Sequence, residues 1–176
     1  MSAALVTLTA AHVLVSLIGL GSGFLVLWGL LRNKRVESWT AIFLATTIAT
    51  SASGFLFPED HVTPGQIIGV LSLVVLAAAV FARYYQQLAG RWRITYVISA
   101  VTAQYLNFFV LIVQLFLKVP ALKALAPTQT EPAFAVAQLA ALATFLGLGV
   151  FAAIRFRGGS VSDALPRRFT QSQLSS

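Results

Sequence analysis

Five long apolar runs dominate this chain and constrain its fold more than any other feature. They lie within the segments LTAAHVLVSLIGLGSGFLVLWGLL, WTAIFLATTIATSASGFLF, GQIIGVLSLVVLAAAVFARYY, ITYVISAVTAQYLNFFVLIVQLFL and PAFAVAQLAALATFLGLGVFAAI. A helix of about 20 apolar residues spans the ~30 Å of hydrocarbon in a bilayer. We therefore predict an all-α fold, an integral membrane helical bundle of five transmembrane helices.

The composition agrees with a membrane location. Of the 176 residues, 58% are hydrophobic and only 10% are charged, whereas a soluble domain carries ~25% charged residues. The chain has no cysteine, which excludes thiolate chemistry and metal sites built from cysteine. The net charge of +7 comes from short basic clusters between the apolar runs, so we predict no nucleic-acid partner. The predicted partner is the lipid bilayer.

The basic residues predict how the chain is threaded. With the N-terminus outside, only Lys118 and Lys123 lie in outer loops, and ten basic residues lie inside. The ten are Arg32, Lys34, Arg35, Arg83, Arg91, Arg93, Arg155, Arg157, Arg167 and Arg168. An excess of Lys and Arg is typical of cytoplasmic loops. We therefore expect an N-out/C-in bundle over residues 1–157 and a basic, disordered cytoplasmic tail over 158–176.

The fourth run contains three amide side chains within the stretch AQYLNFFVLIVQLFLK. At ~100° per residue, Gln104, Asn107 and Gln114 fall within a stripe ~80° wide on a helix. An amide in hydrocarbon must be hydrogen-bonded, so we expect all three to face the bundle interior. Asn107 lies closest to the bilayer middle and is expected to matter most.

Other runs supply polar side chains that map to the same outer half of the bundle. They are His12 and Ser16 on the first run, Thr46, Thr50 and Ser53 on the second, and Gln138 on the fifth. Two hypotheses remain open for this cluster. It either joins the helices through hydrogen bonds worth ~0.6–2 kcal/mol each, or lines an outward-opening pocket for a small ligand. The candidate ligand-binding residues are His12, Ser16, Thr50, Ser53, Gln104, Asn107, Gln114 and Gln138. The first four of these are also the expected partners of Asn107.

The two histidines, His12 and His61, are weak candidates for metal binding. Both are predicted near the outer face, where neutral imidazoles could ligate haem iron or another metal. However, His61 lies in the acidic loop PEDHVTPGQ and not on a helix facing His12. We therefore predict no cofactor, and keep haem b as the alternative.

Two further segments carry structural predictions. Gly19 and Gly23 form a GxxxG motif, which lets a neighbouring backbone approach closely. We expect packing inside the bundle rather than dimerisation, with Gly147 and Gly149 as a counterpart. The outer loop KVPALKALAPTQTEP is too apolar for a free linker. We expect it to lie at the membrane interface as a cap, the alternative being a plain interfacial loop.

Enzyme motifs are absent from the sequence. It contains no nucleophile elbow, phosphate loop, HExxH motif or pair of intramembrane carboxylates. This pattern favours a non-enzymatic protein, acting as a small-ligand binding module or as an accessory subunit of a membrane complex. The alternative is a redox protein that handles haem or quinone. The third hypothesis is a small-solute channel assembled as a homo-oligomer.

Several segments resemble a family of small, functionally unassigned bacterial inner-membrane proteins. They are YLNFFVLIVQ, FLKVPALKALAPTQTEP, GFLFP, ARYYQQLAGRWR and EPAFAVAQL, and the resemblance covers most of residues 10–157. It implies a multi-pass protein of the bacterial inner (cytoplasmic) membrane and a helical bundle. It implies no catalytic or ligand-binding residues.

Overall fold

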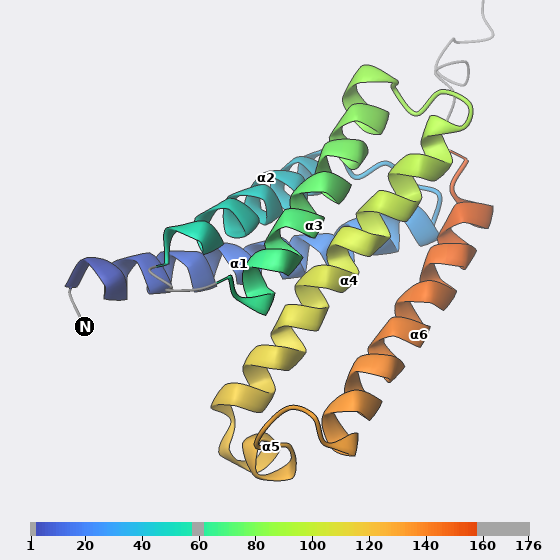
Figure 1. The fold of residues 1–176 in the computed structure, drawn as a ribbon. Helices are drawn as coiled ribbons and strands as arrows, with labels where there is room; N and C mark the ends of the chain where they lie inside the picture. Colours follow the sequence, from blue (N-terminus) through green and yellow to red (C-terminus); the bar gives the residue numbers. More distant parts are fainter. Residues whose placement is uncertain (1–2, 58–61, 158–176) are drawn as a thin grey trace, which may run out of the picture.

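The computed structural model describes residues 3–57 and 62–157, and every regular element in these ranges is helical (Figure 1). Five helices there are long and apolar enough to span a membrane, which confirms the predicted number. The elements are α1 (Ala3–Leu31), α2 (Glu37–Ser53) continued by η1 (Gly54–Leu56), α3 (Pro64–Val80) continued by the π-helical η2 (Phe81–Tyr85), α4 (Trp92–Lys118), the short α5 (Pro120–Leu125) and α6 (Pro132–Arg155). The N-out/C-in orientation stays a prediction, and the tail 158–176 lies outside the described residues.

Local sequence explains why α1 ends where it does. Asn33 adopts a left-handed conformation with φ of 53°, which asparagine tolerates better than most residues. The Lys34 N–H donates to the Gly29 carbonyl at 2.8 Å, and the Asn33 N–H donates to the Leu30 carbonyl at 3.2 Å. These two bonds form a Schellman cap that satisfies the last carbonyls of α1. The cap folds the chain back against α1 before α2 begins.

The start of α3 is determined by a capping box. The Thr63 hydroxyl accepts from the Gln66 N–H at 3.2 Å, and the Gln66 side-chain oxygen accepts from the Thr63 N–H at 3.1 Å. Pro64 occupies the first turn, where its missing N–H is not needed. The box satisfies two backbone donors that would otherwise lack partners.

The helices pack closely at one end of the bundle and spread apart toward the other. α1 runs along α2, α4 runs along α6, and α3 contacts both α2 and α4 (Figure 1). We call the end where α1 and η2 finish and α4 begins the basic end, because it carries the arginine and lysine clusters. The larger hydrophobic core lies toward this end and includes Leu30, Phe43, Leu76 and Val97.

A smaller core lies beneath α5 at the opposite end. It contains Ile112, Phe116, Ala126 and Ala141. The Gln129 side-chain amide donates to the Val113 carbonyl at 2.9 Å, which ties the segment after α5 to α4. The loop therefore packs against the bundle and is not a free linker, as expected from its apolar sequence. Its location at a membrane interface stays a prediction.

Glu131 holds the turn between α5 and α6. One carboxylate oxygen accepts from the Thr128 N–H at 3.1 Å and from the Thr128 hydroxyl at 2.9 Å, and the other accepts from the Thr130 N–H at 3.0 Å. Loss of hydration raises the pKa of this carboxyl, but these hydrogen bonds to the ionised form outweigh it. The pKa of Glu131 therefore lies below its ordinary value of 4.5.

We expect this turn to loosen in acid. A carboxyl group with a depressed folded-state pKa adds stability above its ordinary pKa, and that stability is lost as the pH falls through the lower folded value. Hydrogen-exchange protection of the Thr128 and Thr130 amides should thus fall as the pH drops below 4.5. In Glu131→Gln the protection should be low already at neutral pH and show no acid step. An unchanged acid step in this variant would contradict the assignment.

Candidate functional site

The predicted polar residues on the first two runs meet along the seam between α1 and α2. The His12 Nδ1 and the Ser53 hydroxyl lie 2.8 Å apart. The Ser16 hydroxyl donates to the His12 carbonyl at 2.6 Å and lies 3.4 Å from the Thr50 hydroxyl. The His12 ring also meets the Phe57 ring edge-on, with centroids 5.3 Å apart. All four polar side chains therefore have partners within the protein.

Gln104 occupies the centre of the bundle, as predicted. Its side chain is 1% exposed, and its Nε2 donates to the Leu20 carbonyl of α1 at 2.9 Å. Its Oε1 accepts no hydrogen bond. A Cβ added at Gly23 would lie 1.8 Å from this oxygen, so the oxygen faces the Gly23 backbone. A Cα–H···O contact of this kind recurs where helices meet closely.

Asn107 also faces the interior, but its partner differs from the four expected ones. Its Nδ2 donates to the Thr47 hydroxyl at 3.2 Å, and Thr47 is fully buried. Thr47 lies about one turn nearer the basic end than Thr50 and almost two turns nearer than Ser53. Asn107 itself is only half-buried, so the most deeply buried amide is Gln104.

The expectation that Gln114 faces the interior is wrong. Gln114 is exposed, because the helices have spread apart where α4 ends. Gln138 does link two helices, since its Nε2 donates to the Phe109 carbonyl of α4 at 3.3 Å. Its buried Oε1 has no partner. Thr46 satisfies its hydroxyl on its own helix, at the Ile42 carbonyl 2.7 Å away.

The GxxxG motif of α1 packs inside the bundle, which confirms one expectation and corrects another. A Cβ at Gly19 would meet the Thr46 and Thr47 hydroxyls at 3.2 Å, so α2 approaches α1 closely there. The predicted glycine counterpart on α6 is wrong. Gly147 has no atom within 4 Å of its Cβ position, and Gly149 faces Val101 of α4. The close neighbours of the motif are hydroxyl and amide side chains.

The eight predicted residues do not surround one pocket. They form separate contacts along α1–α2, at the centre of the bundle and between α4 and α6, while Gln114 stands apart. None of the eight residues lines the groove beside α6 or the cleft at the basic end, both described below. The contacts favour the hypothesis that the polar side chains join the helices.

We expect Asn107→Leu to lower the free energy of unfolding by about 1 kcal/mol. Leucine keeps a similar volume but removes the donor to Thr47 and leaves that buried hydroxyl without this partner. Gln114→Leu is the matched control, because the exposed Gln114 amide makes no interhelical bond. Unfolding titrations in detergent should separate the two variants, and equal stabilities would contradict the interhelical role of Asn107.

A cluster that the sequence reasoning missed lies at the basic end. Arg83 of η2 pairs with Glu37 of α2 at 2.5 Å, with its side chain 5% exposed against 63% for Glu37. The guanidinium carbon lies 5.1 Å from the Tyr96 ring centroid, a cation–π distance. Tyr96 in turn hydrogen-bonds to Thr40. A signal was present, because Arg83 stands inside an apolar run and Glu37 is the acidic residue nearest to the predicted inner loops.

A groove of about 350 Å³ opens between α1, α4 and α6. The residues that line it are Phe24, Phe108, Ala137, Ala140, Ala141, Thr144, Phe145 and Leu148. The three phenylalanine rings meet at one side, with centroids 5.6 to 6.5 Å apart. The single hydroxyl in the lining, that of Thr144, donates to the Ala140 carbonyl at 2.8 Å. The groove thus presents an apolar wall with no free polar group.

Comparison with protein-family models, with curated proteins and with solved structures finds no match. The resemblance to bacterial inner-membrane proteins therefore stays a prediction. Of the two histidines considered for metal binding, His61 lies outside the described residues and His12 contacts Ser53. Across residues 3–57 and 62–157, no three His, Asp or Glu side chains gather as a ligand set.

Proposed function

We propose that this protein is a non-enzymatic, multi-pass protein of the bacterial inner membrane that serves as an accessory subunit of a membrane complex. In this proposal the N-terminus lies outside, the C-terminus lies in the cytoplasm, and a partner's transmembrane helix docks in the groove between α1, α4 and α6. The groove is the observation that carries the proposal, because the predicted polar residues form separate contacts between helices and do not line it.

The surface of α6 supports a helix as the occupant. Only Ala141, Phe145 and Ala152 of its 24 residues are buried. Ala137 and Ala141, and likewise Ala140 and Thr144, are four residues apart, so small side chains follow one face of the helix. Small residues at this spacing let a second backbone approach closely, which is how helices associate in a bilayer.

A small-ligand binding module fits this groove less well. Ligand pockets combine apolar walls with a few polar groups that converge on the ligand, whereas the one hydroxyl here is bound to its own helix. A lipid chain could also fill the groove, but it gains nothing from the small-residue spacing that a helix uses.

A photo-crosslinking amino acid at Ala140 tests the proposal in living cells. Ala140 lines the groove, whereas the neighbouring Leu139 is exposed and, at about 100° per residue, lies on the side of α6 opposite the lining residues. Leu139 therefore serves as the control position. We expect a discrete adduct with one membrane protein from position 140 and not from position 139. An adduct with a second copy of this chain would favour the homo-oligomer instead, and adducts with lipid alone would refute docking.

The proposed orientation has its own test. Reporter fusions after Arg157 should be active in the cytoplasm and silent in the periplasm, because ten basic residues would then lie inside. A fusion active only in the periplasm would reverse the topology and leave the groove proposal standing.

A further inference from the structure

The basic end carries far more positive than negative charge. In the described residues it contains one carboxylate, Glu37, against eight cations. The cations are Arg32, Lys34, Arg35, Arg83, Arg91, Arg93, Arg155 and Arg157. Cations clustered where helices leave a membrane attract anionic lipid headgroups, and basic pockets between helices can bind them.

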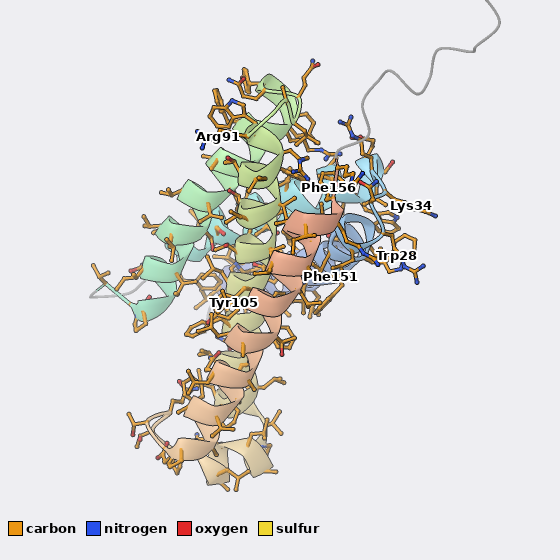
Figure 2. All side chains as sticks on the ribbon, turned by 90° about the vertical axis from the view of Figure 1, so that its right-hand side faces the viewer. Trp28, Lys34, Arg91, Tyr105, Phe151 and Phe156 are labelled. Carbon is orange, nitrogen blue, oxygen red and sulfur yellow. The ribbon has the colours of Figure 1, made fainter. Side chains whose placement is uncertain are left out.

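Three of these cations line one cleft. Lys34 and Arg35 of the α1–α2 turn and Arg83 of η2 line it. The other lining residues are Thr40, Tyr96 and the apolar Val26, Leu30, Val36 and Phe156. Figure 2 shows Lys34, Trp28 and Phe156 at this end of the molecule, and the Lys34 amine lies 5.7 Å from the Trp28 ring centroid.

The turn that carries Lys34 and Arg35 is held firmly over α1. A Cβ at Gly29 would meet the Lys34 carbonyl at 3.0 Å and the Val36 side chain at 2.9 Å, so only glycine lets the turn lie this close. The Asn33 side chain also accepts from the Arg157 N–H beyond α6 at 2.7 Å. The backbone is fixed from two sides, while both basic side chains remain exposed.

Arg83 at the floor of the cleft is incompletely paired. Its side chain is 95% buried, one terminal nitrogen bonds Glu37, and its buried Nε has no hydrogen-bond partner. A buried donor without a partner is costly. A guanidinium has a planar set of donors that matches the oxygens of a phosphate.

We propose that this cleft binds a phosphate group, with Lys34 and Arg35 as the outer contacts and Arg83 at the floor. The group belongs to an anionic lipid headgroup or to a free phosphate, since both present the same oxygens. The cleft is closed to water in this conformation, so the two exposed side chains swing aside when the anion enters. Glu37 competes with the anion for Arg83.

The test uses native mass spectrometry of the purified full chain released from nanodiscs. It compares the amount of phosphatidylglycerol that the protein retains with the amount of phosphatidylcholine. The double variant K34Q/R35Q should lose retention roughly tenfold, because two charge-assisted contacts are removed. The control R91Q/R155Q removes the same charge from exposed positions at the same end, and its retention should stay near wild type. An equal loss of retention in both variants would show that the lipid responds only to the total positive charge of this end, and would refute the specific site.

A third variant changes retention in the opposite direction. E37Q removes the carboxylate that competes for Arg83 but keeps an amide oxygen, so the anion should bind more tightly than in wild type. A purely structural role of these residues would lower retention or leave it unchanged, and either result would count against the proposal. Thermal unfolding of each variant shows that the compared proteins are folded.

Titration with inorganic phosphate of the protein in nanodiscs that contain phosphatidylglycerol separates the two sources. Displacement of phosphatidylglycerol by millimolar phosphate, with the same dependence on Lys34 and Arg35, would assign the site to a free anion. Retention that resists phosphate would assign it to the lipid. Binding of neither probe would refute the proposal.

Discussion

Gly23→Ala should lower the free energy of unfolding by about 3 kcal/mol, the upper part of the range for an overpacked core. The added Cβ would lie 1.8 Å from Oε1 of Gln104, 2.5 Å from its Cδ and 2.9 Å from a ring carbon of Phe43. Gln104 cannot simply move aside, because it is 1% exposed and its Nε2 is bound to the Leu20 carbonyl. The methyl group therefore separates α1 from α4 or breaks that bond.

Alanine substitutions of two other glycines of α1 provide a comparison for this result. Gly21 has no atom within 4 Å of its Cβ position and is exposed, so Gly21→Ala should not destabilise the protein. At Gly19 the atoms nearest to the Cβ position lie 3.2 Å away. The loss of stability in Gly19→Ala should therefore lie between those of Gly21→Ala and Gly23→Ala. Unfolding in a detergent titration measures all three.

A second substitution shows whether the Gln104 side chain causes the loss of stability in Gly23→Ala. Gln104→Ala removes the atoms that clash, so the Gly23→Ala/Gln104→Ala double variant should be more stable than the sum of the single effects predicts. Contacting residues couple in this way. Strict additivity, or equal effects of Gly23→Ala and Gly21→Ala, would show that Gln104 does not pack on Gly23.

Glu37→Ala should cost about 2 kcal/mol, less than the 3–5 kcal/mol of a fully buried pair because Glu37 is 63% exposed. The substitution leaves the buried Arg83 without its carboxylate. Arg83→Met should cost less, about 1 kcal/mol, because the Glu37 carboxylate then returns to water. Substitution of the more exposed Glu37 should thus lower stability more than substitution of the buried Arg83, which is the reverse of what burial alone would suggest.

The double variant Glu37→Ala/Arg83→Met checks this reasoning. Removing both charges leaves no buried charge without a partner, so the double variant should be more stable than Glu37→Ala alone. Thermal unfolding at low and high salt gives the comparison. A larger loss for Arg83→Met than for Glu37→Ala would mean that the packing of Arg83 on Tyr96, and not its charge, stabilises this end.

Most of the helical architecture could be predicted from sequence. The apolar runs coincide with α1, α2, α3, α4 and α6, because lipid burial requires helices that are apolar over a full membrane thickness. The inward position of Gln104 and Asn107 followed from the cost of an unpaired amide. The same rule failed for Gln114, since a residue near a helix end can be exposed where the neighbouring helices diverge.

The sequence could not supply the partners of these residues. Which hydroxyl Asn107 bonds depends on how far α2 and α4 are shifted along each other, and a one-turn difference replaces Thr50 by Thr47. The pairing of Arg83 with Glu37 joins residues 46 positions apart, which helical periodicity cannot relate.

The sequence by itself determined the number and approximate bounds of the five long apolar helices and the distribution of basic residues between the loops, but not the short α5. Hydrophobicity and helix caps act over one segment at a time, so each can be evaluated without its neighbours. Only the tertiary structure decided that the polar residues lie in separate contacts and that Gly23 faces Gln104. It also decided that a groove opens beside α6 and that Arg83 lies at the floor of a basic cleft. These features depend on the tilt and spacing of whole helices, which arise from packing among many side chains at once.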